Sequence, residues 1–109
     1  MATLTVQDIT TSGLEPDFSA ADVAGDKFAW DRYRFLHVKN GGASPVTVDV
    51  VSQRGAVPGL APANIEVTIP AGEERIIGPF DKDGFRKADG MVEVTYSGVT
   101  SVTVAAFNL

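Results

Sequence analysis

The alternation of apolar and polar residues is clearest where the chain reads Val92-Glu93-Val94-Thr95-Tyr96-Ser97-Gly98-Val99-Thr100-Ser101-Val102-Thr103-Val104. Successive side chains of a strand point to opposite faces of a sheet, so a period of two predicts strands. The same alternation recurs at residues 3–6, 46–50 and 65–69. All these runs are rich in Val, Ile and Thr, which favour strands. The chain is therefore expected to be all-β.

Glycine, proline and asparagine mark where these strands end. The Asn40-Gly41-Gly42 segment suits a tight turn, so residues 34–39 and 45–52 are predicted to form a hairpin. Residues 91–97 and 101–109 are predicted to form a second, closing hairpin. The spacing gives seven or eight short strands, which is typical of an antiparallel β-sandwich or a jelly-roll-like barrel.

The remaining segments complete one domain over residues 1–109. Residues 1–11 are interpreted as an N-terminal arm or first strand. Residues 54–64 contain two glycines and two prolines and are expected to form an exposed loop. Further expected elements are short strands at 26–30, 65–69 and 74–77, and one helical turn around Phe85.

Composition excludes several classes of function. The chain has 109 residues, no cysteine and a net charge of −5, so it is expected to fold without disulfides. Nucleic-acid binding normally needs a basic face, and the Lys and Arg residues are scattered, with Arg32, Arg34 and Lys39 as an example of a local basic patch. No signal peptide or membrane-spanning run is present, so we expect a chain made in the cytoplasm that binds neither nucleic acid nor membrane.

No motif in the sequence supports catalysis or metal binding. His37 is the only histidine, and it lies in a strand without a nucleophile motif around it. Asp81-Lys82-Asp83-Gly84 resembles the start of a calcium loop, but the twelfth position, where the loop needs Glu, is Val92. Glu73 and Glu74 are interpreted as a charged sheet edge that discourages aggregation. We therefore expect no catalytic residues, no cofactor, no metal and no small-molecule substrate.

Two apolar segments are the candidates for contact with other proteins. Four aromatic residues lie within residues 28–35, where they suit either a core and interface or a platform for a sugar or base. Residues 101–109 carry no charge and are apolar on both faces, which predicts a central strand or one that meets another subunit. Together with the arm, these segments supply the predicted partner-binding residues Leu4, Val6, Trp30, Tyr33, Phe107 and Leu109.

Motifs along nearly the whole chain resemble a family of small virion proteins of tailed bacteriophages, encoded near the major capsid protein. The matching motifs are Ala2-Thr3-Leu4-Thr5-Val6-Gln7-Asp8, Ser12-Gly13-Leu14-Glu15-Pro16, Gly25-Asp26-Lys27-Phe28-Ala29, Phe35-Leu36-His37-Val38-Lys39-Asn40-Gly41-Gly42, Val67-Thr68-Ile69-Pro70-Ala71-Gly72, Ile77-Gly78-Pro79-Phe80 and Val94-Thr95-Tyr96-Ser97-Gly98-Val99-Thr100-Ser101-Val102-Thr103-Val104-Ala105. These motifs are structural, and the family offers no catalytic residues to carry over.

The resemblance implies a non-enzymatic structural protein of the virion, assembled in the host cytoplasm. Its expected role is capsid decoration (a cement protein), with the major capsid protein as partner and a homo-oligomer, such as a trimer, as the bound form. The alternatives are a head-tail connector or tail-tube protein, or an Ig-like module that binds a carbohydrate or receptor through Trp30 and Tyr33. The arm is expected to add a strand to a neighbour's sheet edge.

Overall fold

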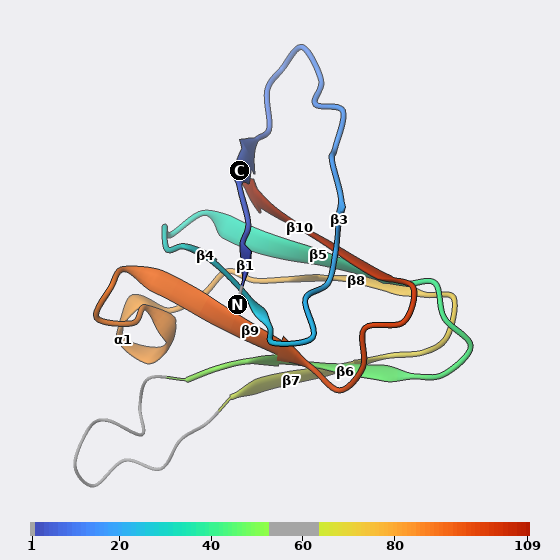
Figure 1. Ribbon diagram of the computed structural model, residues 1–109. Coiled ribbons are helices and arrows are strands. Elements are labelled where there is room, and N and C mark those ends of the chain that lie inside the picture. Colours follow the sequence, from blue (N-terminus) through green and yellow to red (C-terminus); the bar gives the residue numbers. More distant parts are fainter. Residues whose placement is uncertain (1, 53–63) are drawn as a thin grey trace, which may run out of the picture.

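The computed structural model describes residues 2–52 and 64–109, which form two stacked sheets and one short helix (Figure 1). In sheet A the order is β1 (Ala2–Thr3), β4 (Asp26–Ala29), β9 (Met91–Tyr96), β6 (Val46–Val50) and β7 (Ile65–Ile69). In sheet B it is β2 (Val6–Asp8), β10 (Val102–Asn108), β5 (Arg34–Asn40) and β8 (Glu74–Ile77), and β3 (Ser19–Ala20) also pairs with β10. The all-β sandwich predicted from the alternation is confirmed.

The core lies between the two sheets because alternate residues of both point inward. The fully buried apolar side chains come from sheet A (Phe28, Val48, Val50, Ile69, Val92 and Val94) and from sheet B (Leu36, Val38, Val102, Val104 and Ala106). Burial of each larger one stabilises the fold by roughly 1.5–3 kcal/mol. The helical turn expected around Phe85 is α1 (Lys82–Phe85), which lies at one end of the sandwich and buries Phe85 against the core (Figure 1).

The N-terminal segment differs from the prediction in number and direction of strands. It forms two strands, because residues 4 and 5 carry the chain from sheet A, where β1 lies, to sheet B, where β2 lies. Both run parallel to their partners, β1 beside β4 and β2 beside β10. With β3 added, the described residues form ten strands instead of seven or eight, and the sheets are mixed instead of antiparallel throughout.

Both predicted hairpins are wrong, because each pair of consecutive strands is divided between the sheets. Strand β5 belongs to sheet B and β6 to sheet A, while β9 belongs to sheet A and β10 to sheet B. Residues 41–45, 70–73 and 97–101 are therefore corners that carry the chain from one sheet to the other, and all three lie at the same end of the molecule (Figure 1). A turn signal predicts where a chain reverses but not which sheet it enters.

Asn40 connects these corners through its side chain, which is 1% exposed. Its Nδ2 donates hydrogen bonds to the carbonyl oxygens of Ser44 at 2.8 Å and Ile69 at 3.0 Å, and its Oδ1 accepts one from the Gly42 amide at 3.1 Å. Gly42 packs closely on the third corner, where a Cβ would lie 2.9 Å from the Thr100 carbonyl oxygen. The sheet switches therefore depend on contacts between residues that are far apart in sequence.

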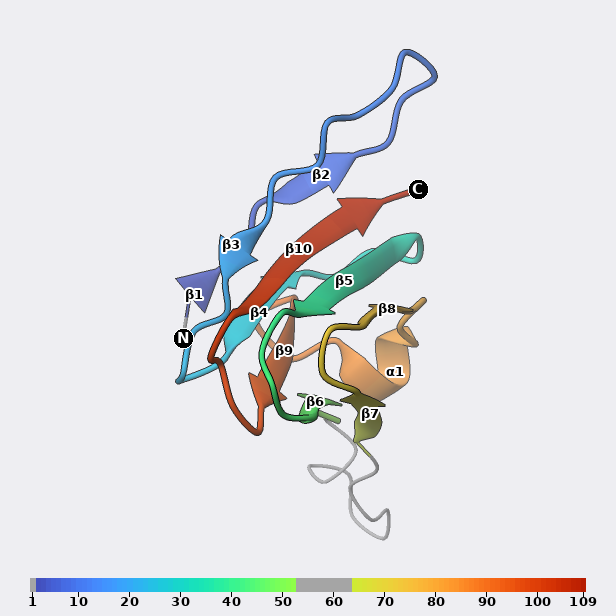
Figure 2. The same cartoon turned by 90° about the vertical axis from the view of Figure 1, so that its right-hand side faces the viewer.

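The N-terminal arm packs on its own chain. Leu4 is 8% exposed and belongs to the core, and the half-buried Val6 packs against it. Residues 9–18, between β2 and β3, extend past the end of β10 (Figure 2). Of the loop predicted at 54–64, only Asn64 lies within the described residues. No helix in the described part of the chain is long and apolar enough to span a bilayer.

Candidate functional site

The outer face of sheet B carries aromatic side chains at its centre. Phe35, His37 and Lys39 of β5 point outward, because Leu36 and Val38 between them are fully buried in the core. The neighbouring strands continue this face in register. Phe107 of β10 lies beside Phe35, and Ile76 of β8 lies beside His37.

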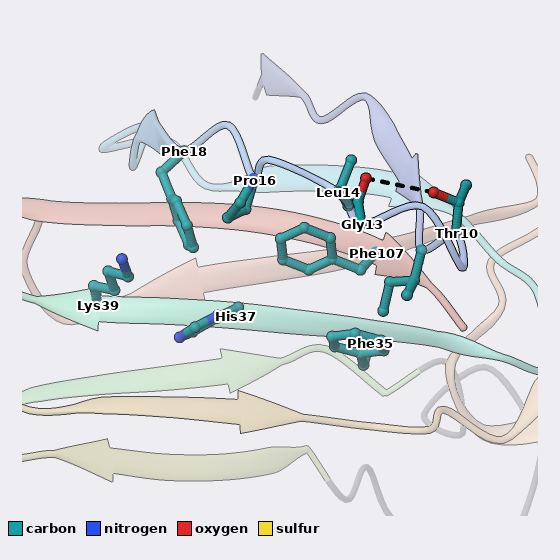
Figure 3. Close-up of a pocket in the computed structure, with 10 residues that line it drawn as sticks. Thr10, Gly13, Leu14, Pro16, Phe18, Phe35, His37, Lys39 and Phe107 are labelled. Carbon is teal, nitrogen blue, oxygen red and sulfur yellow. Dashed lines mark hydrogen bonds between the residues drawn. The ribbon is translucent and has the colours of Figure 1, made fainter.

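Residues 9–18 lie over this face and form a groove with it (Figure 3). The Phe18 ring packs edge-on against His37, with ring centroids 5.1 Å apart, and against Phe107 at 6.2 Å. Phe107 is consequently only 5% exposed although it faces away from the core. The groove has a volume of about 360 Å³, and its apolar lining comes mainly from Ile9, Leu14, Phe18, Phe35 and Phe107.

The polar groups of the groove make few contacts. The Lys39 ammonium lies 4.1 Å from the centroid of the Phe18 ring, which is a cation–π contact. His37 Nε2 lies 3.3 Å from Glu74 Oε1, but without hydrogen-bond geometry, so the two form an ion pair only when the imidazole is protonated. None of the hydrogen bonds among the described residues joins His37 to a serine or threonine hydroxyl, as a nucleophile and its base would require.

The apolar surface continues beyond the groove to the end of β10. The backbone N–H of Leu109 donates to the Tyr33 carbonyl oxygen at 3.0 Å, which places both residues beside Phe35. With Ile76 and Pro79 they line a second hollow of about 380 Å³. We call this continuous surface the apolar face, and its members are Ile9, Leu14, Phe18, Tyr33, Phe35, Ile76, Phe107 and Leu109.

Exposed large apolar residues gather on the apolar face. Among the described residues there are five of them, and four lie here: Ile9 (44% exposed), Tyr33 (56%), Ile76 (65%) and Leu109 (76%). The fifth, Val23, lies elsewhere. Scattered single apolar residues are normal on protein surfaces, whereas a contiguous group marks a contact surface.

The outer face of sheet A is polar by contrast. Its outward residues alternate with buried valines, as Thr47 and Asp49 do in β6. Cross-strand pairing sets Thr68 beside Thr47 and Glu66 beside Asp49. The sandwich therefore has one acidic, threonine-rich face and one apolar face.

The structure brings together three of the six predicted partner-binding residues. Tyr33, Phe107 and Leu109 all lie on the apolar face, although residues 9–18 cover Phe107. Leu4 and Val6 lie inside the chain's own sandwich instead. Trp30 lies apart and half-buried at the α1 end, where its Nε1 donates to the Phe80 carbonyl oxygen at 2.8 Å.

Sequence reasoning missed five members of this surface as partner-binding residues: Ile9, Leu14, Phe18, Phe35 and Ile76. Strand alternation in residues 34–39 contained the signal for Phe35, since it places Phe35 on the same side as His37. Ile76 could not be assigned, because its position beside His37 depends on the pairing of β8 with β5. Phe18 reaches the face only through the path of residues 9–18.

A buried carboxyl group lies between β4 and β9. Asp26 is 1% exposed, and its Oδ2 accepts hydrogen bonds from the Tyr96 hydroxyl at 2.7 Å and the Asp22 amide at 3.3 Å. Its Oδ1 is buried without a hydrogen-bond partner. Burial, followed by the hydrogen bond to Asp26, raises the pKa of Tyr96 far above its ordinary value.

Replacing Tyr96 with phenylalanine should lower the free energy of unfolding by about 1–3 kcal/mol near pH 7, because Asp26 would lose its hydroxyl donor inside the core. The raised pKa of Tyr96 stabilises the folded state fully below the ordinary tyrosine pKa of about 10, and this stabilisation is lost as the pH rises above it. Urea unfolding near pH 7 and pH 11 measures both effects. The variant should lose less stability than the wild type at high pH, and an equal loss would contradict this role.

Metal binding receives no support in residues 2–52 and 64–109, where His, Asp and Glu side chains nowhere gather in threes that could hold an ion.

Comparison with protein-family models, curated proteins and solved structures found no match for this chain.

Proposed function

We propose that this protein is a structural component of a tailed-phage virion, a decoration protein that binds the outer surface of the head through its apolar face. The observation that carries the proposal is the grouping of four of the five large exposed apolar side chains of the described residues on one side of sheet B. The resemblance of the sequence motifs to small phage head proteins names the partner, the major capsid protein.

The proposed role suits the asymmetry of the two faces. Protein interfaces have an apolar, aromatic centre, which Tyr33, Phe35 and Ile76 would supply. The acidic face of sheet A would then point to solvent. Its charges would oppose close contact with the same face of another copy. A decoration protein binds many equivalent places on a shell, and association between its copies converts modest single-site affinity into avidity.

A capsid-binding assay tests the proposal with matched substitutions. Leu109→Asp should lower the affinity for purified heads at least about tenfold, because it places a charge in the apolar contact. Val23→Asp is the control, since Val23 is 84% exposed and lies outside the apolar face. Co-sedimentation with heads measures both affinities. Equal binding by the two variants, or no binding by the wild type, would overturn the proposal.

The position on the particle separates the proposal from its structural alternatives. Cryo-electron microscopy of the virion that carries this chain should place its density over the outer shell. Density at the neck or along the tail would instead identify a head-tail connector or tail-tube protein.

A carbohydrate-binding role is the second candidate, and the surroundings of Trp30 favour it. Trp30 borders an open hollow together with Arg32, Asp81 and Lys82, so an aromatic side chain lies beside charged hydrogen-bonding groups, as sugar sites require. Glycan-array binding that is lost on Trp30→Ala would support this role. The decoration role predicts no glycan signal.

A further inference from the structure

Two sheet edges lie on the same side of the sandwich, and one of them is already capped. The β5–β8 ladder includes a hydrogen bond from the Asn40 amide to the Glu73 carbonyl oxygen at 2.9 Å. Because hydrogen-bonded pairs alternate along antiparallel strands, the carbonyl of Glu74 points away from β5 to the free edge. Arg75 Nη1 donates to that carbonyl at 2.8 Å, and Nη2 pairs with Glu73 at 3.1 Å. One outward carbonyl group of the β8 edge is therefore already occupied, which opposes strand addition there.

The β7 edge lacks such a cap among the described residues. The β6–β9 ladder uses the backbone of Thr47 and Val51, whose partners are Ser97 and Glu93. By alternation, Val46, Val48 and Val50 bond to β7. Within β7 the N–H and C=O groups of residues 66 and 68 consequently point outward, and no described strand lies beyond them.

The inward side chains of β7 are also incompletely covered. Ile65 and Val67 pack against the core but remain half-buried, whereas their partners Val50 and Val48 in β6 are fully buried. A strand laid along the β7 edge would complete their burial and satisfy four outward backbone groups. The incomplete burial and the free backbone groups therefore both favour an additional strand beside β7.

We propose that a second copy of this chain is that neighbour, bound by antiparallel pairing of the two β7 strands about a two-fold axis at Val67. In this register Glu66 of each copy lies opposite Thr68 of the other, Ile65 lies opposite Ile69, and the two Val67 side chains meet. The surface is self-complementary, as a two-fold interface must be. It joins the two A sheets into one continuous sheet.

The charges and the proline of β7 select this register. Shifting the pairing by two residues in one direction sets Glu66 opposite Glu66, and like charges directly opposite are destabilising. Shifting it in the other direction sets Glu66 opposite Pro70, which has no N–H to donate. The register centred on Val67 alone avoids both penalties while keeping two hydrogen-bonded residue pairs.

A cysteine placed at Val67 tests the contact directly, because the chain has no cysteine of its own. The two copies of residue 67 form a non-hydrogen-bonded pair, whose Cα atoms approach closely enough for a disulfide. Mild oxidation of Val67→Cys should give at least about fivefold more covalent dimer than Val99→Cys, a matched half-buried valine elsewhere on the core. Equal yields from the two variants would overturn the proposal.

Charge substitutions test the register. Thr68→Glu places two carboxylates opposite each other twice in the dimer, and the dissociation constant measured by sedimentation should rise roughly tenfold. Adding Glu66→Lys should restore the dimer, because each lysine then faces an introduced carboxylate. Failure of this rescue would overturn the register. Leu109→Asp should leave the dimer intact, so the outcome is independent of the proposed capsid contact.

Discussion

Replacing Asn40 with alanine should lower the free energy of unfolding by about 2–4 kcal/mol, because the hydrogen bonds of this buried side chain would be lost. The Asn40 amide donates to the carbonyl oxygens of Ser44, which lies in the first corner, and of Ile69, which ends β7 directly before the second. Alanine removes the side-chain donor of both carbonyl groups, although Ile69 keeps its ladder bond to Val46, and it removes the acceptor of the Gly42 amide. Urea unfolding followed by tryptophan fluorescence measures the loss.

Two further variants separate the hydrogen bonds of Asn40 from its size and residue type. Asn40→Asp keeps the shape but turns the donor into an acceptor that faces carbonyl oxygens, so it should be at least as destabilising as alanine. Asn108→Ala is the matched control, since Asn108 ends strand β10 and its Oδ1 is buried without a hydrogen-bond partner. An Asn40→Ala loss no larger than that of Asn108→Ala would contradict the role given to Asn40.

The same corners explain how far the fold could be predicted from the sequence. Strands 65–69 and 74–77 have the predicted bounds, because Pro70 and Gly78-Pro79 end them locally. Their pairing could not be predicted in this way. The turn residues after Asn40 reverse the chain in either a hairpin or a sheet switch, and the choice depends on hydrogen bonds to residues about thirty positions away.

The candidate site could also be predicted only where it depends on local alternation. Alternation alone places Phe107 and Leu109 on the face of β10 opposite Val104, and it indicated that this strand is covered on both sides. The sequence could not indicate what covers it. The cover on the outer face is Phe18, which lies in a segment without periodicity. Leu4 was predicted to meet a partner, but it fills its own core because β1 and β2 each pair with a different sheet.

Removing residues 2–8 should destabilise the fold severely, because this segment covers the β4 edge of sheet A, extends sheet B beside β10 and supplies Leu4 to the core. Replacing Leu4 alone with alanine should cost about 2–4 kcal/mol, the usual range for a buried leucine. That cost is a large part of the 5–15 kcal/mol that stabilises a typical domain. Ile9→Ala is the control, since Ile9 directly follows the removed segment and is 44% exposed. Thermal unfolding measures the expected ranking of stability, in which the full chain and Ile9→Ala exceed Leu4→Ala and the deletion is least stable.

The loss of stability in Leu4→Ala depends on protein concentration in different ways if the arm packs on its own chain or on a neighbouring copy. Strand exchange between copies would preserve each contact of Leu4, so the size of the effect alone cannot separate the two arrangements. Exchange would make the contribution of Leu4 to the unfolding midpoint depend on protein concentration, whereas the proposed β7 pairing would raise the midpoints of wild type and variant alike. For contacts within one chain, the midpoint difference between the wild type and Leu4→Ala should stay constant on dilution. A difference that shrinks on dilution would assign the arm to a neighbouring copy.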